Sequence, residues 1–339
     1  MRAAALRPAL LGLIVLLAAC ADRPAIEAVP PPMRPTPAVA PPAGPTQEEL
    51  RRARASRNRI TNAAAADAQS SGLGPDAAQS AHYRAVERGL LAQGRLRRDR
   101  VPLDAPITAD RLASDFIQIA LRDEYSRSGD RLLPGAQDAP LRRWRDPVRF
   151  QLEFGQSSDT ALQRIYRGEI AAFAARLQRV TGHPVGLTGN GGNFLVLILS
   201  DSERKSIGQR LGTLIPDLPA QDVAALSALD RDNLCTVFAY SRGSGTDYVR
   251  AVALLRAELP PLLRSSCIHE ELAQGMGLAN DSPTARPSIF NDDEEFALLT
   301  RHDELLLQIL YDPRLRPGMT EAEAIPIVRE IAAELLPSS

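Results

Sequence analysis

The run Phe194–Leu199 constrains the fold more than any other segment, because all of its residues are apolar. A surface helix or a strand with one solvated face would interrupt such a run with polar residues. The run therefore predicts a short strand that is buried on both faces, which occurs where helices cover both sides of a sheet.

Strand and helix patterns alternate around this run. Pro147–Phe154 alternates apolar and polar residues, which predicts a strand with one solvated face, and Ser158–Thr181 has the pattern of a long helix. The predicted class is a mixed α+β domain over residues 111–339. Its further predicted elements are strands at Pro184–Leu187 and Leu234–Tyr240 and helices at Tyr248–Leu259, Arg301–Leu310 and Glu321–Leu336.

A helical region is predicted in front of this domain, over residues 46–110. Thr46 opens a helix with Glu49 three residues later, which is a capping box. A second helix is predicted from Asp76 to about Leu96, and a third from Thr108 to Tyr125, which continues into the domain. These helices form an N-terminal lead-in to the sheet.

The segment Cys267–Asp281 carries the motif on which the functional hypothesis rests. From Glu270 its pattern is E-E-x-x-Q-x-x-G-x-x-N-D, which has the spacing of the metzincin motif H-E-x-x-H-x-x-G-x-x-H with each histidine replaced. Ligands four residues apart share one helix face, and the glycine lets the chain turn back with a third ligand. The candidate metal ligands are thus Glu270, Gln274 and Asn280, and Glu271 is the candidate general base. The predicted fold is a zincin-like, or metzincin-like, mixed sheet with a central motif helix.

Three further residues belong to the predicted surroundings of this site: His269, Asp281 and Met319. His269 cannot begin an H-E-x-x-H motif, because Ala273 occupies the fourth position after it. On a helix His269 points about 100° away from Glu270, so we interpret it as a packing or supporting histidine. Met319 lies in a turn before the last helix, where a metzincin has its methionine turn; a core methionine that fills a gap is the alternative.

Two simpler interpretations concern the motif and an acidic run downstream. The motif also fits an ordinary amphipathic helix that ends at a glycine. The run Asn291–Glu295 could bind a cation, but we interpret it as the start of a helix, with Asn291 as the cap and acidic residues in the first turn.

The N-terminus has the pattern of a bacterial lipoprotein signal. Arg2 and Arg7 precede the apolar run Leu10–Leu17, and Ala18-Ala19 stand directly before Cys20. The run is shorter than the roughly 20 residues of a membrane-spanning helix. We therefore expect residues 1–19 to be removed and Cys20 to carry a lipid anchor in the cell envelope, facing the periplasm. Residues 20–45 are rich in proline and alanine, which predicts an extended tether.

Charge and cysteine content narrow the function classes. The net charge is −1, which argues against a nucleic-acid-binding protein. With Cys20 lipidated, Cys235 and Cys267 remain as an even pair in an oxidising compartment. A disulfide between them would join the strand at Leu234–Tyr240 to the motif helix; two free buried thiols are the alternative.

The motif region resembles a bacterial family known as domain of unknown function 2927. The resemblance rests on Ser266–Gln274, Gly277–Asp281, Ser288–Asp293 and Leu310–Met319, and it extends over about Leu112–Leu336. It implies a zincin-like fold and an exported, often lipidated protein. It implies no particular reaction.

Two function classes follow from the residues. In the first, Glu270, Gln274 and Asn280 hold a metal ion and Glu271 activates water for peptide hydrolysis. One carboxylate and two amide oxygens suit calcium or magnesium better than zinc. In the second, which the loss of three histidines favours, the domain has no metal and binds a protein or peptide partner in the envelope.

Overall fold

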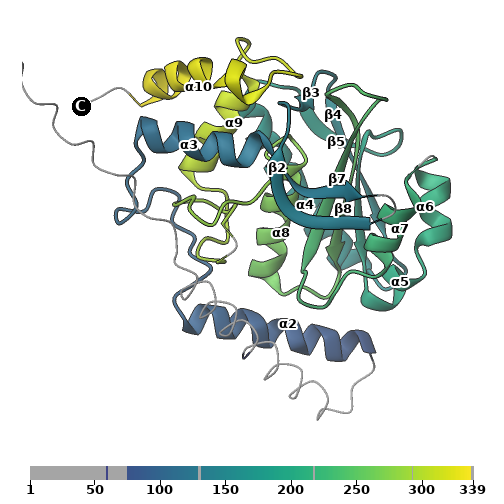
Figure 1. The fold of residues 1–339 in the computed structure, drawn as a ribbon. Helices are drawn as coiled ribbons and strands as arrows, with labels where there is room; N and C mark the ends of the chain where they lie inside the picture. Colours follow the sequence, from purple (N-terminus) through teal and green to yellow (C-terminus); the bar gives the residue numbers. More distant parts are fainter. Residues whose placement is uncertain (1–58, 60–74, 129–130, 217, 292, 337–339) are drawn as a thin grey trace, which may run out of the picture. The chain divides into compact units, whose positions relative to one another are not determined.

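The computed structural model describes residue 59 and residues 75–128, 131–216, 218–291 and 293–336 (Figure 1). The predicted signal peptide, Cys20, the tether and the helix from Thr46 lie outside these residues. Within the described segments, no helix combines the length and the hydropathy that crossing a membrane requires.

The described residues contain a mostly parallel sheet of six strands. The order β5-β4-β6-β8 is parallel throughout, the short β3 pairs in parallel with the start of β8, and β7 pairs antiparallel with β8. The strands are β3 (Arg143–Trp144), β4 (Val148–Phe154), β5 (Val185–Thr188), β6 (Phe194–Leu199), β7 (Cys235–Ser241) and β8 (Asp247–Arg256). The mixed α+β class with its helical N-terminal region is confirmed.

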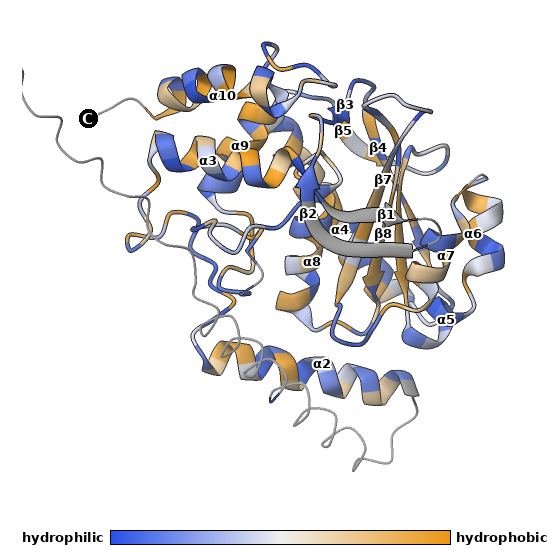
Figure 2. Cartoon of the chain, viewed as in Figure 1, coloured by the Kyte–Doolittle hydropathy of each residue, from blue (hydrophilic) through white to orange (hydrophobic). Residues whose placement is uncertain are grey.

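Helices cover both faces of the sheet. Strand β6 is buried along its whole length, as predicted. Phe194, Val196 and Ile198 join the larger core, whereas Leu195, Leu197 and Leu199 face a second, smaller core. The alternation follows from the two-residue period of a strand. In Figure 2 the strands at the centre of the sheet are coloured mostly as apolar, in agreement with this burial.

The helices divide between the two cores. The larger core includes residues of α3 (Ala109–Ala120), α4 (Thr160–Thr181), α8 (Pro261–Gln274), α9 (Arg301–Tyr311) and α10 (Glu321–Leu335). The smaller core is covered by two short helices, α6 (Gly208–Leu214) and α7 (Ala220–Ser227), which follow the short helix α5 (Asp201–Lys205). The N-terminal helix α2 (Pro75–Ala92) and the antiparallel hairpin of β1 (Arg122–Ser128) and β2 (Arg131–Asp138) complete the described elements.

The prediction of a helix at Tyr248–Leu259 was wrong, because this segment forms β8. An apolar run of this length is compatible with a buried helix or a buried strand. Here the segment lies between β6 and β7 and forms backbone hydrogen bonds with both, which decides the outcome. Tertiary pairing overrides local propensity in such a case.

The prediction of a helix that starts at Asn291 was also wrong. The chain near Glu294 and Glu295 is instead bound to the segment after α2: Leu96 N donates to Glu294 O and Arg97 N donates to Glu295 O. The next helix, α9, begins only after Thr300, whose side chain forms a capping box with Asp303. The third predicted helix is also shorter than expected, since α3 ends at Ala120 and Arg122 enters β1.

Candidate functional site

The motif helix α8 begins at two prolines and is capped by another helix. Its N-cap residue Pro260 offers no side-chain acceptor. Instead Glu87 of α2 accepts hydrogen bonds from the backbone N–H groups of Leu262 and Leu263, both at 3.0 Å. A carboxylate at this position satisfies free N–H groups and interacts favourably with the positive end of the helix dipole. The lead-in region is thereby fixed to the start of the motif helix.

The chain leaves α8 through two glycines, Gly275 and Gly277, of which Gly277 is the glycine of the motif. A Cβ atom at Gly275 would lie 2.4 Å from the ring of Phe194, and Trp144 donates from Nε1 to Gly275 O at 2.8 Å. Gly277 has φ of +127°, and a Cβ atom there would lie 2.4 Å from Arg142 O. Only glycine fits these positions without displacing its neighbours.

Asn280, the third candidate ligand, does not turn back towards α8. Its Nδ2 atom donates to Gln118 O and Asp281 O, both at 2.8 Å, and its backbone N–H donates to Ile119 O. The side chain is buried and joins the loop to α3. The following residue does turn back: Asp281 Oδ1 accepts a hydrogen bond from Gln274 Nε2 at 3.0 Å.

A pocket of about 630 Å³ lies beside α8, between α2, β7, the loop 228–233 and the segment 289–296. Four of the motif residues line it, Glu270, Glu271, Gln274 and Asp281, whereas Asn280 does not. The lining has an apolar part as well: Val86, Leu90, Leu96, Leu263, Ile289 and Phe296.

The pocket is strongly acidic. Six carboxylate residues are part of its lining, and Arg231 is the arginine among the described lining residues. Such an excess of negative charge in a concave site favours cationic ligands. The acidic lining residues are Asp230, Asp232, Glu270, Glu271, Asp281 and Glu294.

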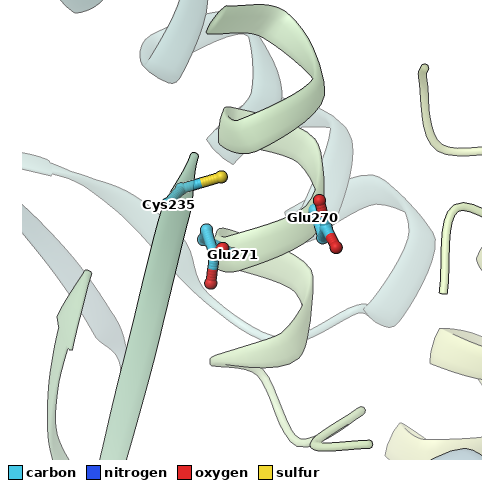
Figure 3. A group of neighbouring side chains, drawn as sticks. All are labelled: Cys235, Glu270 and Glu271. Atoms are coloured by element: carbon cyan, nitrogen blue, oxygen red, sulfur yellow. The ribbon is translucent and has the colours of Figure 1, made fainter. Parts of the chain in front are cut away.

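The predicted disulfide is present and forms part of the pocket wall. Cys235 of β7 and Cys267 of α8 are bonded, with a Cα–Cα distance of 5.9 Å. One side-chain donor atom each of Cys235, Glu270 and Glu271 lies within 4.8 Å of the others (Figure 3). In the disulfide the sulfur of Cys235 is not a thiolate, so the two carboxylates are the anionic groups of this cluster.

Comparison with family descriptions gives one match. The family described as "Protein of unknown function (DUF2927)" matches residues 109–330. The chain belongs to this family. No curated protein and no solved structure matches it.

The DUF2927 region supplies only part of the pocket. Helix α2 precedes the matched residues, yet its residues His82, Tyr83, Val86 and Leu90 line the pocket together with α8. The Tyr83 hydroxyl donates to Arg231 O at 3.2 Å, and burial raises the pKa of this phenol to about 12. The pocket is thus assembled from the DUF2927 region and the helix before it.

Arg256 positions the loop that borders the pocket, and the sequence-based analysis missed it. This arginine is fully buried at the end of β8. Its guanidinium donates to the carbonyl oxygens of Leu229, Asp230 and Asn233. An arginine that ends a continuous apolar run was the available sequence signal, because a buried guanidinium requires several acceptors.

His269 and Met319 lie apart from this pocket. His269 stacks on Phe173 at 4.3 Å between ring centroids, and its Nδ1 accepts from Leu299 N at 3.0 Å. Burial, and next the charge of Arg176, lower the pKa of His269 to about 3, so the ring is neutral. Met319 is buried in the turn before α10, where its carbonyl accepts from Leu141 N.

The metzincin-type donor set does not fit a zinc ion. Glu270 and Gln274 line the pocket but Asn280 does not, because its amide is fixed to Gln118 O and Asp281 O, so the three candidate ligands do not share one site. One carboxylate and two amide oxygens are also a poor match for zinc, which prefers imidazole and thiolate ligands. The geometry of the DUF2927 domain therefore offers a cleft beside the motif helix more readily than a three-ligand metal centre.

Proposed function

We propose that this chain is a lipid-anchored protein of the bacterial cell envelope that binds, without cleaving it, an extended peptide segment with basic side chains. The observation that carries the proposal is an acidic pocket bordered by the strand β7. A strand whose second edge is unpaired can accept an extended chain through backbone hydrogen bonds.

Within the described part of the chain, β7 pairs with β8 alone. Residues 234–238, at the start of this strand, line the pocket. An added peptide strand would therefore pass the acidic wall formed by Glu270, Glu271 and Asp281, where lysine or arginine side chains would be favoured. The zincin-like hypothesis is compatible with this mixed α+β arrangement, in which the motif lies on a helix.

Two observations support the proposed location. The N-terminal sequence has the lipoprotein pattern that ends at Cys20. The Cys235–Cys267 disulfide is typical of proteins that fold in an oxidising compartment. Neither observation depends on the pocket, so the location and the ligand can be tested separately.

The proposal is tested by the binding of fluorescent peptides that differ only in charge. We expect lysine- and arginine-containing peptides to bind and their glutamate counterparts not to bind, with affinity falling as salt is raised. N-methylation of alternate peptide bonds should abolish binding, because it removes backbone donors. Glu270→Gln should weaken binding about threefold to tenfold, through loss of one charge-assisted contact.

The matched control is Asp110→Asn, which removes an exposed carboxylate on α3 outside the pocket. Equal weakening by both variants would mean that only net charge matters, and the proposed site would be wrong. The competing function, peptide hydrolysis with Glu271 as the base, would produce peptide fragments in mass spectrometry. Those fragments should disappear in Glu271→Gln.

A further inference from the structure

We propose that Cys235, Cys267, Glu270 and Glu271 form a zinc site when the disulfide between the two cysteines is reduced. This wall of the pocket would then exist in two states, a disulfide and a metal centre. The inference goes beyond peptide binding and does not depend on it, because it concerns the donor atoms alone.

The spacing on α8 places two carboxylates next to Cys267. Glu270 and Glu271 follow Cys267 by three and four residues, so each is a neighbour of Cys267 across one helix turn, one on either side of it. Cys235 approaches from β7, with its Cα atom 5.9 Å from that of Cys267. Figure 3 shows the Cys235 side chain extending from β7 towards α8, on the side of the helix where Glu271 lies.

Three of the four donor atoms already lie at distances close to those of a metal site, and the fourth, the sulfur of Cys267, is bonded to the sulfur of Cys235. Zinc–sulfur and zinc–oxygen bonds of about 2.3 and 2.0 Å place the donors of a tetrahedral site roughly 3.3–3.8 Å apart. The donor atoms of Cys235, Glu270 and Glu271 already lie within 4.8 Å of one another. Once the two sulfur atoms separate, changes of side-chain rotamer that move the donor atoms by about 1 Å would bring them to the spacing of a zinc site.

The chemistry of the donors changes with the redox state. In the disulfide neither sulfur is anionic, and two carboxylates are a weak site for zinc. Reduction supplies two thiolates, which zinc prefers, and two carboxylates complete four-coordination. The set therefore differs from the oxygen-only set of Glu270, Gln274 and Asn280, which suits zinc poorly.

A dithiol reductant of the thioredoxin type can reduce the disulfide between Cys235 and Cys267. Its thiolate attacks the sulfur of Cys235, which lines the pocket and is half-buried, and the thiolate of Cys267 leaves. The second thiol of the reductant then releases Cys235 and becomes oxidised to a disulfide. Two electrons and two protons pass to the cysteines, and zinc displaces the two thiol protons on binding.

The test measures metal content against redox state. The full chain with Cys20→Ser contains no cysteine other than Cys235 and Cys267. It is reduced with a phosphine, exchanged into anaerobic buffer, mixed with zinc and gel-filtered. We expect about one zinc per reduced chain and almost none in the oxidised chain. Cobalt in place of zinc should give sulfur-to-metal charge-transfer absorption in the reduced chain only.

The controls distinguish a four-ligand zinc site from zinc binding by the two cysteines alone. Glu270→Gln/Glu271→Gln should weaken zinc binding of the reduced chain at least about tenfold, whereas Asp110→Asn should leave it unchanged. Unchanged affinity in the double variant, or equal zinc in both redox states, would overturn the proposal. If the reduced chain unfolds, circular dichroism is followed while zinc or calcium is added. If zinc but not calcium restores the circular dichroism signal of the folded chain, the zinc site is supported. If zinc does not restore this signal, the proposal is refuted.

Discussion

Gly277 and Gly168 are two glycines in opposite situations, and we expect opposite effects when each is replaced by alanine. Gly277→Ala places a side chain at φ of +127° and 2.4 Å from Arg142 O, which should destabilise the fold by about 3 kcal/mol or more. Gly168 lies exposed within α4 with no atom near its Cβ position, so Gly168→Ala should stabilise by about 0.5–1 kcal/mol. Urea unfolding of both variants measures the two changes, and destabilisation by Gly168→Ala would contradict the explanation.

Gly277 and Asn280 show which properties of a single residue can be predicted from the sequence. Gly277 could be predicted, because the motif needs a residue that ends the helix and only glycine adopts the required backbone angle without strain. The direction of Asn280 could not be predicted. Its amide is fixed by the carbonyl oxygen of Gln118, a residue far away in the sequence. A ligand pattern specifies spacing, but the partner that a side chain finds depends on packing.

At the scale of elements, the contact between α2 and α8 leads to a second prediction. Glu87→Ala removes the acceptor of two N–H groups at the start of α8 and should cost about 1–2 kcal/mol. Glu87→Gln keeps an acceptor oxygen but loses the charge, so it should cost less. Arg88→Ala, which changes the exposed neighbour, is the control. Thermal unfolding measures the stability of each variant. Equal destabilisation by all three substitutions would exclude the capping role of Glu87.

Element types were predictable where one periodicity was unambiguous. β4, α4 and β6 follow the predicted segments closely, because alternation, helical length and a short apolar run each indicate one structure. The segment of β8 was not predictable in this way. Its apolar residues are buried whether it forms a helix or a strand, and pairing with β6 and β7 decides between them.

For the whole molecule, the pocket is the feature that sequence patterns predicted least. It combines α2, a loop held by Arg256, β7, α8 and the segment 289–296. The last of these is fixed in place by backbone hydrogen bonds to Leu96 and Arg97. No local pattern indicates such long-range contacts, so the motif residues were found but the cavity that four of them share was not.

His302 connects the stability of the whole fold to pH. It is fully buried on α9, with Nε2 3.1 Å from Asp115 Oδ2 of α3 and Nδ1 3.7 Å from Asp303 Oδ1. Burial alone would lower the pKa of this imidazole. The neighbouring carboxylates of Asp115 and Asp303 favour the protonated ring, outweigh burial and raise the pKa from 6.5 to about 9.

Because the folded-state pKa of His302 is the higher one, the protonated ring stabilises the fold fully below pH 6.5. This contribution is lost as the pH rises through about 9. The free energy of unfolding should therefore decrease by up to about 3 kcal/mol over this window, since each pKa unit corresponds to about 1.4 kcal/mol. Urea unfolding at a series of pH values measures the decrease. His302→Gln removes the titrating group, so its stability should be lower near pH 6 and nearly independent of pH across the window. An equally steep decrease in this variant would assign the pH dependence to other groups.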